Sequence, residues 1–158
     1  TTDGMALDTI LIQREFSTED DERRRAERVT EIIRQALEGK LRLRDAVAGA
    51  TQQRSRLKAF SVEPRVIIDN QSSNLFTVIE INRLDRIGLL YKLTEALFHL
   101  SLNIASAHIT TFGEKAIDVF YVTDLTGDKI LSPARHAQIE RELMKVLAPM
   151  PERLANSA

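Results

Sequence analysis

Cysteine and tryptophan are both absent from the 158-residue chain, and aromatic residues make up only 5% of it. Without cysteine there can be no disulfide, no thiolate nucleophile and no thiolate metal site. A reducing, cytoplasmic location is the expectation that follows. No apolar run approaches the roughly 20 residues of a membrane-spanning helix, and no signal-peptide pattern follows the first residue.

Neither sign of charge is in clear excess, because 22 basic and 23 acidic residues leave a net charge of -1. That balance favours neither a nucleic-acid partner nor a membrane surface. The length allows one ordinary domain or two small ones. The chain begins with Thr1 rather than Met, so we expect it to be a piece of a longer protein.

An internal repeat is present. The opening TTDGMALDTILIQ returns later as TTFGEKAIDVFYVTD, with one inserted residue. The matching positions are Thr1, Thr2, Gly4, Ala6 and Asp8 in the first copy and Thr110, Thr111, Gly113, Ala116 and Asp118 in the second. Each copy predicts a glycine-containing hairpin turn that leads into a strand, followed by a polar loop and a helix.

The first copy predicts a strand over residues 6–13 and then a helix. Ser17 or Thr18 can cap this helix, four acidic residues follow in its first turn, and it should run to about Glu38. Gly39 ends it. A short amphipathic helix around Leu41, Leu43 and Val47 is expected next, before a linker over residues 51–64.

The second copy has more sequence before it. Strands are expected over residues 65–69 and 75–82, joined by the turn DNQSSN, and over 103–112, where a Gly113-Glu114 turn joins the third strand to a fourth. Between the second and third strands, Asp85 can cap a helix that ends near residues 101–103. A last helix should begin with Ser132 as its cap and Pro133 in the first helical position. The apolar residues at helical spacing are Leu89, Leu90, Leu93, Leu97 and Leu100 in the first helix and Ile139, Leu143, Val146 and Leu147 in the second.

The order ββαββα predicts an α+β fold of ferredoxin-like type, permuted so that its last strand comes first. Both helices should lie on one face of a four-stranded antiparallel sheet. Because the central strands are apolar on both sides, we expect the second face to be covered as well. The predicted division is residues 1–50 as the C-terminal half of a first unit, 51–64 as linker, 65–148 as a complete second unit, and 149–158 as tail.

The connecting stretch KLRLRDAVAGATQQRSRLKAF is basic, with six cations and one acid, Asp45. A solvated connector whose arginine stems cover a neighbouring helix explains this pattern. A docking surface for an acidic partner is the alternative to this favoured interpretation.

The segments NRLDRIGLLYKLTEAL, NIASAHITTFGEKAIDVFYVTD and TGDKI resemble an ACT domain. More specifically, they resemble the second of two C-terminal ACT domains in the bifunctional PII uridylyltransferase/uridylyl-removing enzymes of bacterial nitrogen signalling. VEPRVIIDNQSSN resembles the entry into that domain, and GKLRLRDAVA resembles the connector before it. The first copy of the repeat would then be the end of the preceding ACT domain.

The resemblance implies a regulatory role, in which glutamine binds and switches distant active sites from uridylylation of PII to its reversal. Nucleotidyl transfer, phosphodiester hydrolysis and the Mg²⁺ they need would belong to the rest of such an enzyme, with no catalytic residue and no cofactor in this stretch. The unpaired strand over residues 6–13 should add to the edge of a complete sheet, in the same chain or in a homodimer.

The resemblance also implies a ligand site in the loop from Asn82 to Gly88. Helix N-terminal N–H groups can bind an α-carboxylate, and a carboxylate such as Asp85 can bind an α-ammonium group. Gly88 permits close approach because it has no Cβ. The implied ligand-binding residues are Asn82, Asp85, Gly88 and Leu89, with Asn103 and Ile104 contributing across an interface between ACT units. A plain N-cap for Asp85 and tight packing for Gly88 are the structural alternatives, and Ile87 stands where the family commonly has proline.

Other functions fit the sequence less well. His99, His108 and His136 lack the spacing of a helical metal pair, and His108 should lie on a sheet surface. Asp8 and Asp118 recur at matching positions, which favours a shared structural task such as satisfying a turn or a helix end. An RNA-binding module shares the fold, but its aromatic motif is missing. A regulatory or oligomerising ACT module of an amino-acid biosynthetic enzyme stays open as an alternative.

Overall fold

The computed structural model describes residues 18–51, 63–112 and 115–148. Contacts divide the chain into two compact units, with the boundary along the sequence between Ala46 and Val47, and each unit is described by itself. No helix in these described ranges combines the length and the apolar character needed to cross a bilayer.

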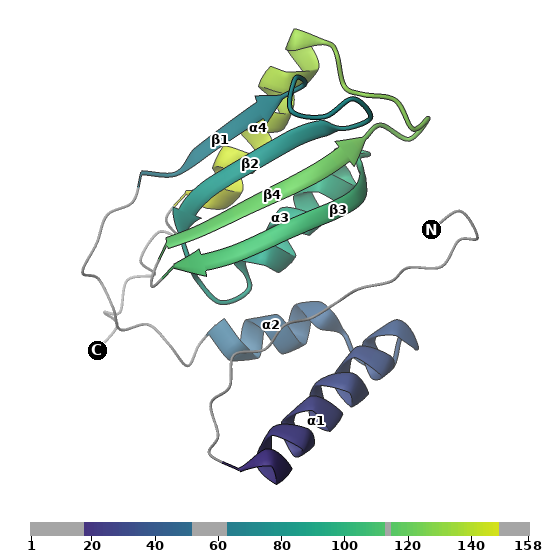
Figure 1. Ribbon diagram of the computed structural model, residues 1–158, viewed down its shortest axis with the longest axis vertical. Coiled ribbons are helices and arrows are strands. Elements are labelled where there is room, and N and C mark those ends of the chain that lie inside the picture. Colours follow the sequence, from purple (N-terminus) through teal and green to yellow (C-terminus); the bar gives the residue numbers. More distant parts are fainter. Residues whose placement is uncertain (1–17, 52–62, 113–114, 149–158) are drawn as a thin grey trace, which may run out of the picture. The chain divides into compact units, whose positions relative to one another are not determined.

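The second unit contains a four-stranded antiparallel sheet in the order β1-β2-β4-β3 (Figure 1). Its strands are β1 (Arg65–Asp69), β2 (Thr77–Leu84), β3 (Asn103–Phe112) and β4 (Lys115–Thr123), and its helices are α3 (Leu89–His99) and α4 (Pro133–Leu147). The order along the chain is therefore ββαββα, with neighbouring strands antiparallel throughout. This confirms the predicted fold class.

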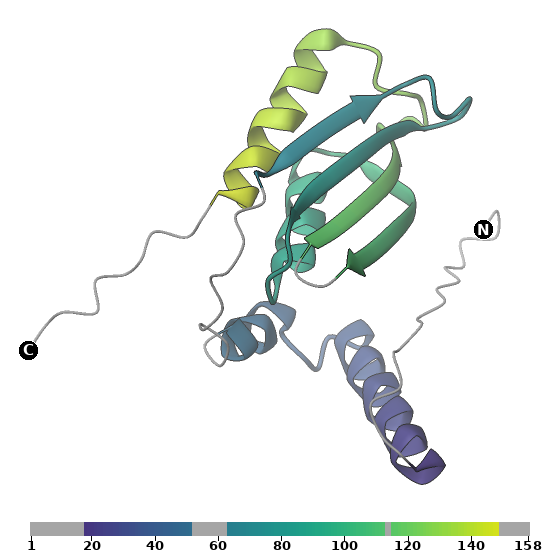
Figure 2. The same ribbon diagram turned by 60° about the vertical axis from the view of Figure 1, so that its left-hand side comes forward.

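Both helices lie on the same side of the sheet (Figure 2). The apolar stripe of α3 and that of α4 pack on alternate residues of the central strands, such as Ile79 and Ile81 on β2 and Phe120 and Val122 on β4, all of them at most 1% exposed. The opposite face carries Val78 and the Tyr121 ring, which lies 5.7 Å from the exposed His108 ring in an edge-on arrangement. His108 is thus on the sheet surface, as predicted. Whether this second face is covered stays a prediction.

Arginines from opposite ends of the helix pair bind the helix C-termini. Arg86, just before α3, donates to the carbonyl oxygens of Val146 and Ala148 at the end of α4, at 2.5 and 3.2 Å. Arg135, in the first turn of α4, donates to the carbonyl oxygen of Leu100 at the end of α3. Because the last carbonyls of a helix lack partners within it, each arginine both satisfies them and complements the helix dipole. The pair is therefore tied together at both ends.

Strand β2 begins two residues later than the sequence predicts. Leu75 is 70% exposed and lies in the turn, where Ser73 Oγ accepts hydrogen bonds from the N–H groups of Leu75 and Phe76. The side chain of Asp69 also accepts from backbone N–H groups of the turn. Local side-chain bonds of this kind compete with strand pairing, which explains why the turn is longer than the apolar pattern suggests.

Thr77 joins this turn to the segment before α4. Its hydroxyl donates to Asn70 Oδ1 at 2.7 Å and accepts from the Ile130 N–H at 2.9 Å, and its side chain is fully buried. Asn70 in turn donates to the Ile130 carbonyl, which also contacts His136 Nε2 at 2.5 Å. The network holds the β1–β2 turn against the segment between β4 and α4 at one end of the sheet.

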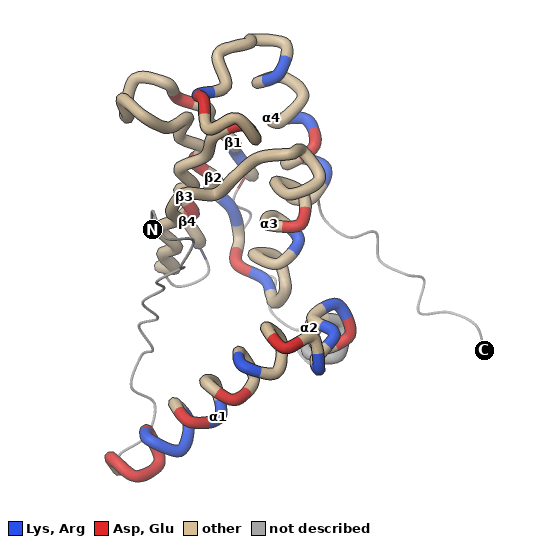
Figure 3. The backbone as a smooth tube through the Cα atoms, turned by 90° about the vertical axis from the view of Figure 1, so that its right-hand side faces the viewer, with Lys and Arg blue, Asp and Glu red and all other residues tan. Residues whose placement is uncertain are grey.

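The first unit contains α1 (Glu19–Leu37), and α2 (Leu43–Thr51) follows it. Thr18 is the N-cap of α1 and accepts from the Asp21 N–H, four acidic residues occupy the first turn, and the helix ends before Gly39 at φ 71°. Figure 3 shows the acidic residues at the start of this helix and the basic ones that follow. These boundaries, and those of β1, β3 and α4, confirm the sequence predictions. The predicted strand over residues 6–13 and the Gly113-Glu114 turn lie outside the described residues.

We predict that Thr77→Val lowers the free energy of unfolding by about 1–3 kcal/mol, because the buried Ile130 N–H and Asn70 amide lose their partner while the side-chain volume is kept. Urea unfolding followed by circular dichroism measures this. Thr111→Val is the control at an exposed strand position and should change stability little. Equal effects of the two substitutions would contradict the role given to Thr77.

Candidate functional site: the loop between β2 and α3

A tight turn connects β2 to α3. The Leu89 N–H donates to the Arg86 carbonyl at 3.1 Å, and Gly88, at φ 77° and ψ 2°, is the third residue of the four. This is the geometry of a type II turn, which requires a positive φ at that position and so favours glycine. Proline is common at the second position, where this chain has Ile87. The family's proline is therefore a turn residue, and the turn forms here without it.

Asp85 is not the N-cap of α3, which corrects the sequence prediction. The cap position is taken by Gly88, and no side chain caps this helix end. Asp85 instead lies beside Arg83, with its Oδ1 3.4 Å from Arg83 Nη1, and its side chain remains 48% exposed. The loop thus places a half-exposed carboxylate next to a helix N-terminus that lacks a side-chain cap. The positive end of the helix dipole and a negative side chain are both accessible there.

Arg83 and Asp118 form an ion pair inside the unit, and the sequence analysis missed it. Arg83 Nη2 donates to Asp118 Oδ2 at 2.5 Å, and the two side chains are 3% and 0% exposed. Asp118 therefore satisfies Arg83 rather than the expected turn or helix end. The signal was in the strand alternation, because Arg83 is in phase with Ile79 and Ile81, and Asp118 with Phe120. Opposite charges at inward positions of neighbouring strands indicate a buried pair.

Burial sets the direction in which the pKa values of Asp118 and Arg86 are shifted. Loss of solvation raises the pKa of Asp118 above its ordinary value, Arg83 opposes this, and the carboxylate of Asp85 adds to the rise. Burial also lowers the pKa of Arg86, and the charge of Arg83 contributes in the same direction. The four side chains thus interact electrostatically, although only Asp85 is well exposed.

The side chains of Asn82 and Leu89, the other two expected site residues near the loop, point away from it. Asn82 lies on the sheet face opposite to the helices, and its amide donates to Glu80 Oε1 at 2.7 Å. Leu89 is 2% exposed in the core, and its N–H closes the turn. The structure therefore brings together Asp85, Gly88 and the first turn of α3, with Leu89 contributing its place in the backbone.

Asn103 and Ile104 lie at the other end of the sheet. They pair with Thr123 and Val122 at the end of β4, whereas Leu84, at the end of β2, pairs with Lys115 at the beginning of β4. The two places are separated by the length of β4, on the order of 25 Å at the usual rise of a strand. Within one unit they cannot contact the same small molecule. Their expected role requires a second unit and stays a prediction.

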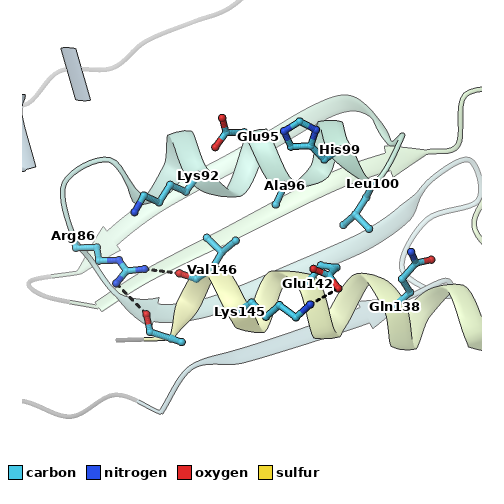
Figure 4. A pocket seen from close by; sticks show the side chains of 11 residues that line it. Arg86, Lys92, Glu95, Ala96, His99, Leu100, Gln138, Glu142, Lys145 and Val146 are labelled. Carbon is cyan, nitrogen blue, oxygen red and sulfur yellow. Dashed lines mark hydrogen bonds and ion pairs between the residues drawn. The ribbon is translucent and has the colours of Figure 1, made fainter. Parts of the chain in front are cut away.

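A groove of about 700 Å³ runs between α3 and α4 on the surface away from the sheet (Figure 4). Arg86 and Lys92 lie toward one end, and Figure 4 shows Arg86 reaching across to the last turn of α4. Glu142 accepts from Lys145 at 2.8 Å inside the groove. No group of three or more potential metal-binding side chains occurs within residues 18–51, 63–112 and 115–148.

Residues 72–147 match the family model described as the ACR family N-terminal ACT domain. Together with the permuted ferredoxin-like topology and the glycine turn before α3, this shows that the second unit is an ACT domain.

The relatives place this domain among one group of enzymes. The chain is 61% identical over 94% of its length to proteins named bifunctional uridylyltransferase/uridylyl-removing enzyme from Bradyrhizobium sp. strain ORS 278 and strain BTAi1, and 57% identical to one from Nitrobacter hamburgensis. It therefore belongs with the ACT-containing region of that family. The chain spans 16% of the length of these relatives. No solved structure matches it.

We predict that Ile87→Pro stabilises the domain by about 0.4–1 kcal/mol, because proline suits the second position of a type II turn and restricts the unfolded chain. Gly88→Ala should destabilise it by about 1 kcal/mol or more, because φ is positive there. Thermal unfolding of the two variants measures both effects. Opposite signs are expected, and a loss of stability in Ile87→Pro would show that the turn has been assigned wrongly.

Proposed function

We propose that this chain is an amino-acid-sensing regulatory region, and that its ligand is glutamine. In a longer protein of the uridylyltransferase/uridylyl-removing type, ligand binding would control uridylylation of the protein PII and its reversal. The names of the relatives support the enzyme context, and the ACT domain supports the regulatory role. The activities themselves, and the Mg²⁺ they would use, are proposed for the whole protein.

The observation that carries this proposal is the meeting of two complementary polar features at the loop. The N-terminus of α3 has no side-chain cap, which suits an α-carboxylate. The half-exposed carboxylate of Asp85 suits an α-ammonium group. Gly88 keeps the turn free of a side chain between them. A free amino acid carries both of the charges for which this loop has partners.

A partial ACT unit before the complete one is the second element of the proposal. Val29, Ile33, Ala36 and Leu37 of α1 precede Ile139, Leu143, Val146 and Leu147 of α4 by the same spacing that separates Asp8 from Asp118. The α4 residues pack in the core, whereas none of the residues of α1, all of them described, is buried. Leu37 is 84% exposed. We infer that α1 presents the core-facing stripe of a unit like the second one.

Such a stripe would be covered by another ACT unit, either from the same longer protein or from a second copy of this chain. For the 158-residue chain alone, a homodimer is the proposed state. This arrangement could also bring Asn103 and Ile104 of one unit to the loop of another. A ligand that bound better to one arrangement of units than to another would act allosterically.

Glutamine binding is tested by titration calorimetry on the 158-residue chain. We expect saturable binding by the wild type and a loss of about tenfold or more in Asp85→Asn, because the ligand ammonium loses its charged partner. Glu140→Gln removes an exposed acid on α4, away from the loop, and should bind as the wild type does.

Other amino acids, tested in the same way, define the specificity. No heat with millimolar glutamine, together with strong binding of a different amino acid, would overturn glutamine as the ligand but leave the sensing role. No binding of any amino acid would overturn the proposed function as a whole.

Self-association is tested by sedimentation velocity over a range of concentrations. We expect the wild type to dimerise and Ile33→Asp to shift the population to monomer, since the substitution places a charge in the apolar stripe of α1. Glu27→Gln, on the same helix, is the control. A wild type that stays monomeric at all concentrations would contradict the homodimer.

A further inference from the structure

Arg83 connects the core of the ACT domain to the loop. It is the last inward-pointing residue of β2 and lies two residues before Asp85. Its Nη2 donates to the fully buried Asp118 at 2.5 Å, and its Nη1 lies 3.4 Å from both Asp85 Oδ1 and the Leu84 carbonyl oxygen. One guanidinium group therefore lies between a buried carboxylate and an exposed one.

The two contacts differ in strength. At 2.5 Å the bond to Asp118 is short and charge-assisted, whereas 3.4 Å is beyond the usual range of a direct hydrogen bond. Arg83 is thus held mainly by Asp118, and its hold on Asp85 is weak. Asp85 keeps most of its negative charge unneutralised, and its side chain reaches solvent.

The pair with Asp118 is also incomplete. Arg83 Nε and Asp118 Oδ1 are buried atoms that have no hydrogen-bond partner in the described structure. Two parallel bonds between a guanidinium and a carboxylate are stronger than one, and unpaired buried polar atoms are costly. A small turn of the guanidinium, away from Asp85 and toward Asp118, would satisfy both atoms at once.

The charges around Asp118 are few. Its register neighbours on β2 and β3 are Ile81 and Ile109, and the charged groups that act on its carboxyl are Arg83 and Asp85. The charge of Arg83 also reaches Arg86 on the other side of the loop. A change in the charge of Asp118 therefore acts on Asp85 both directly and through Arg83.

We propose that Arg83 is a positioning residue of the ligand site. When the site is empty, Arg83 contacts both Asp118 and Asp85. When a ligand ammonium group becomes the counterion of Asp85, Arg83 pairs with Asp118 alone. This inference rests on the proposed function. Asp118 keeps Arg83 from neutralising Asp85, so it controls affinity without contacting the ligand. The ligand, in turn, completes the buried pair.

Removing the charge of Asp118 tests this directly. In Asp118→Asn, Arg83 loses its anionic partner and turns to Asp85, where it competes with the ligand ammonium. We expect the affinity for glutamine, or for whichever amino acid the wild type binds, to fall by about tenfold, or about 1.4 kcal/mol.

A second substitution separates positioning from mere stability. In Arg83→Met/Asp118→Asn the competing cation is gone, and we expect affinity to recover to within about threefold of the wild type. Because the double substitution also removes an unpaired buried cation, urea unfolding of both variants is measured alongside. A purely structural role predicts that affinity follows the folded fraction, whereas positioning predicts that folded Asp118→Asn binds more weakly than the folded double variant. Glu140→Gln again serves as the control, and calorimetry at one pH and salt concentration compares all variants.

A measurement on the wild type keeps the test independent of variant folding. Carboxyl-carbon NMR should show the pKa of Asp118 falling when the site is saturated, because Arg83 then belongs to it alone. A buried arginine without a partner is strongly destabilising, so Asp118→Asn is compared with the double variant only if both fold.

The outcomes are distinct. Wild-type affinity in Asp118→Asn, a double variant that binds no better than the single one, or an Asp118 pKa that does not respond to ligand would overturn this inference while amino-acid binding stands. A wild type that binds no amino acid would overturn the proposed function, and this inference with it.

Discussion

The ion pair between Arg83 and Asp118 is the buried interaction that links the core of the ACT domain to the loop before α3. Among the buried residues of the described ranges, these two are the charged ones, and both belong to the central strands. Breaking one partner would leave a charge in the core, which costs about 3–5 kcal/mol in comparable cases. An apolar pair of similar volume could stabilise the fold as well or better. Stability alone therefore does not explain why charges are placed there, whereas the proposed role in the adjacent loop would.

Much of the fold could be predicted from the sequence, because the signals are local. The apolar spacing of Leu93 and Leu97 fixes the buried side of α3, Ser132 and Pro133 fix the start of α4, and Gly39 fixes the end of α1. Each signal acts within a few residues, so no tertiary information is needed. The layering of such units predicted that both helices lie on one face of the sheet.

The sequence predictions that the structure corrects concern residues whose type suits more than one structural role. Asp85 is of a residue type that often caps helices, but the turn containing Gly88 lies between it and α3, and its side chain contacts Arg83 instead. Leu75 extends the apolar pattern of β2, but the hydroxyl of Ser73 holds it in the turn. Asp118 found its partner 35 residues away, on another strand. In each case a tertiary or side-chain contact overrides a local preference, and a single sequence does not display such contacts.

The geometry of the candidate loop could be predicted only in part, for the same reason. The turn and the charge of Asp85 are local features, whereas the roles of Asn103 and Ile104 depend on a second unit. The stripe of α1 and the long exposed strand β3 both offer surfaces for such a unit. A site that needs two units is well suited to regulation, since whatever moves one unit relative to the other also changes the ligand's surroundings.

The most direct test of this account is a map of amide chemical shifts in the 158-residue chain during titration with glutamine. The account predicts that the largest changes fall on residues 85–91, with a smaller response at Asp118. Changes confined to the groove between α3 and α4, or to the open face around Tyr121, would contradict it.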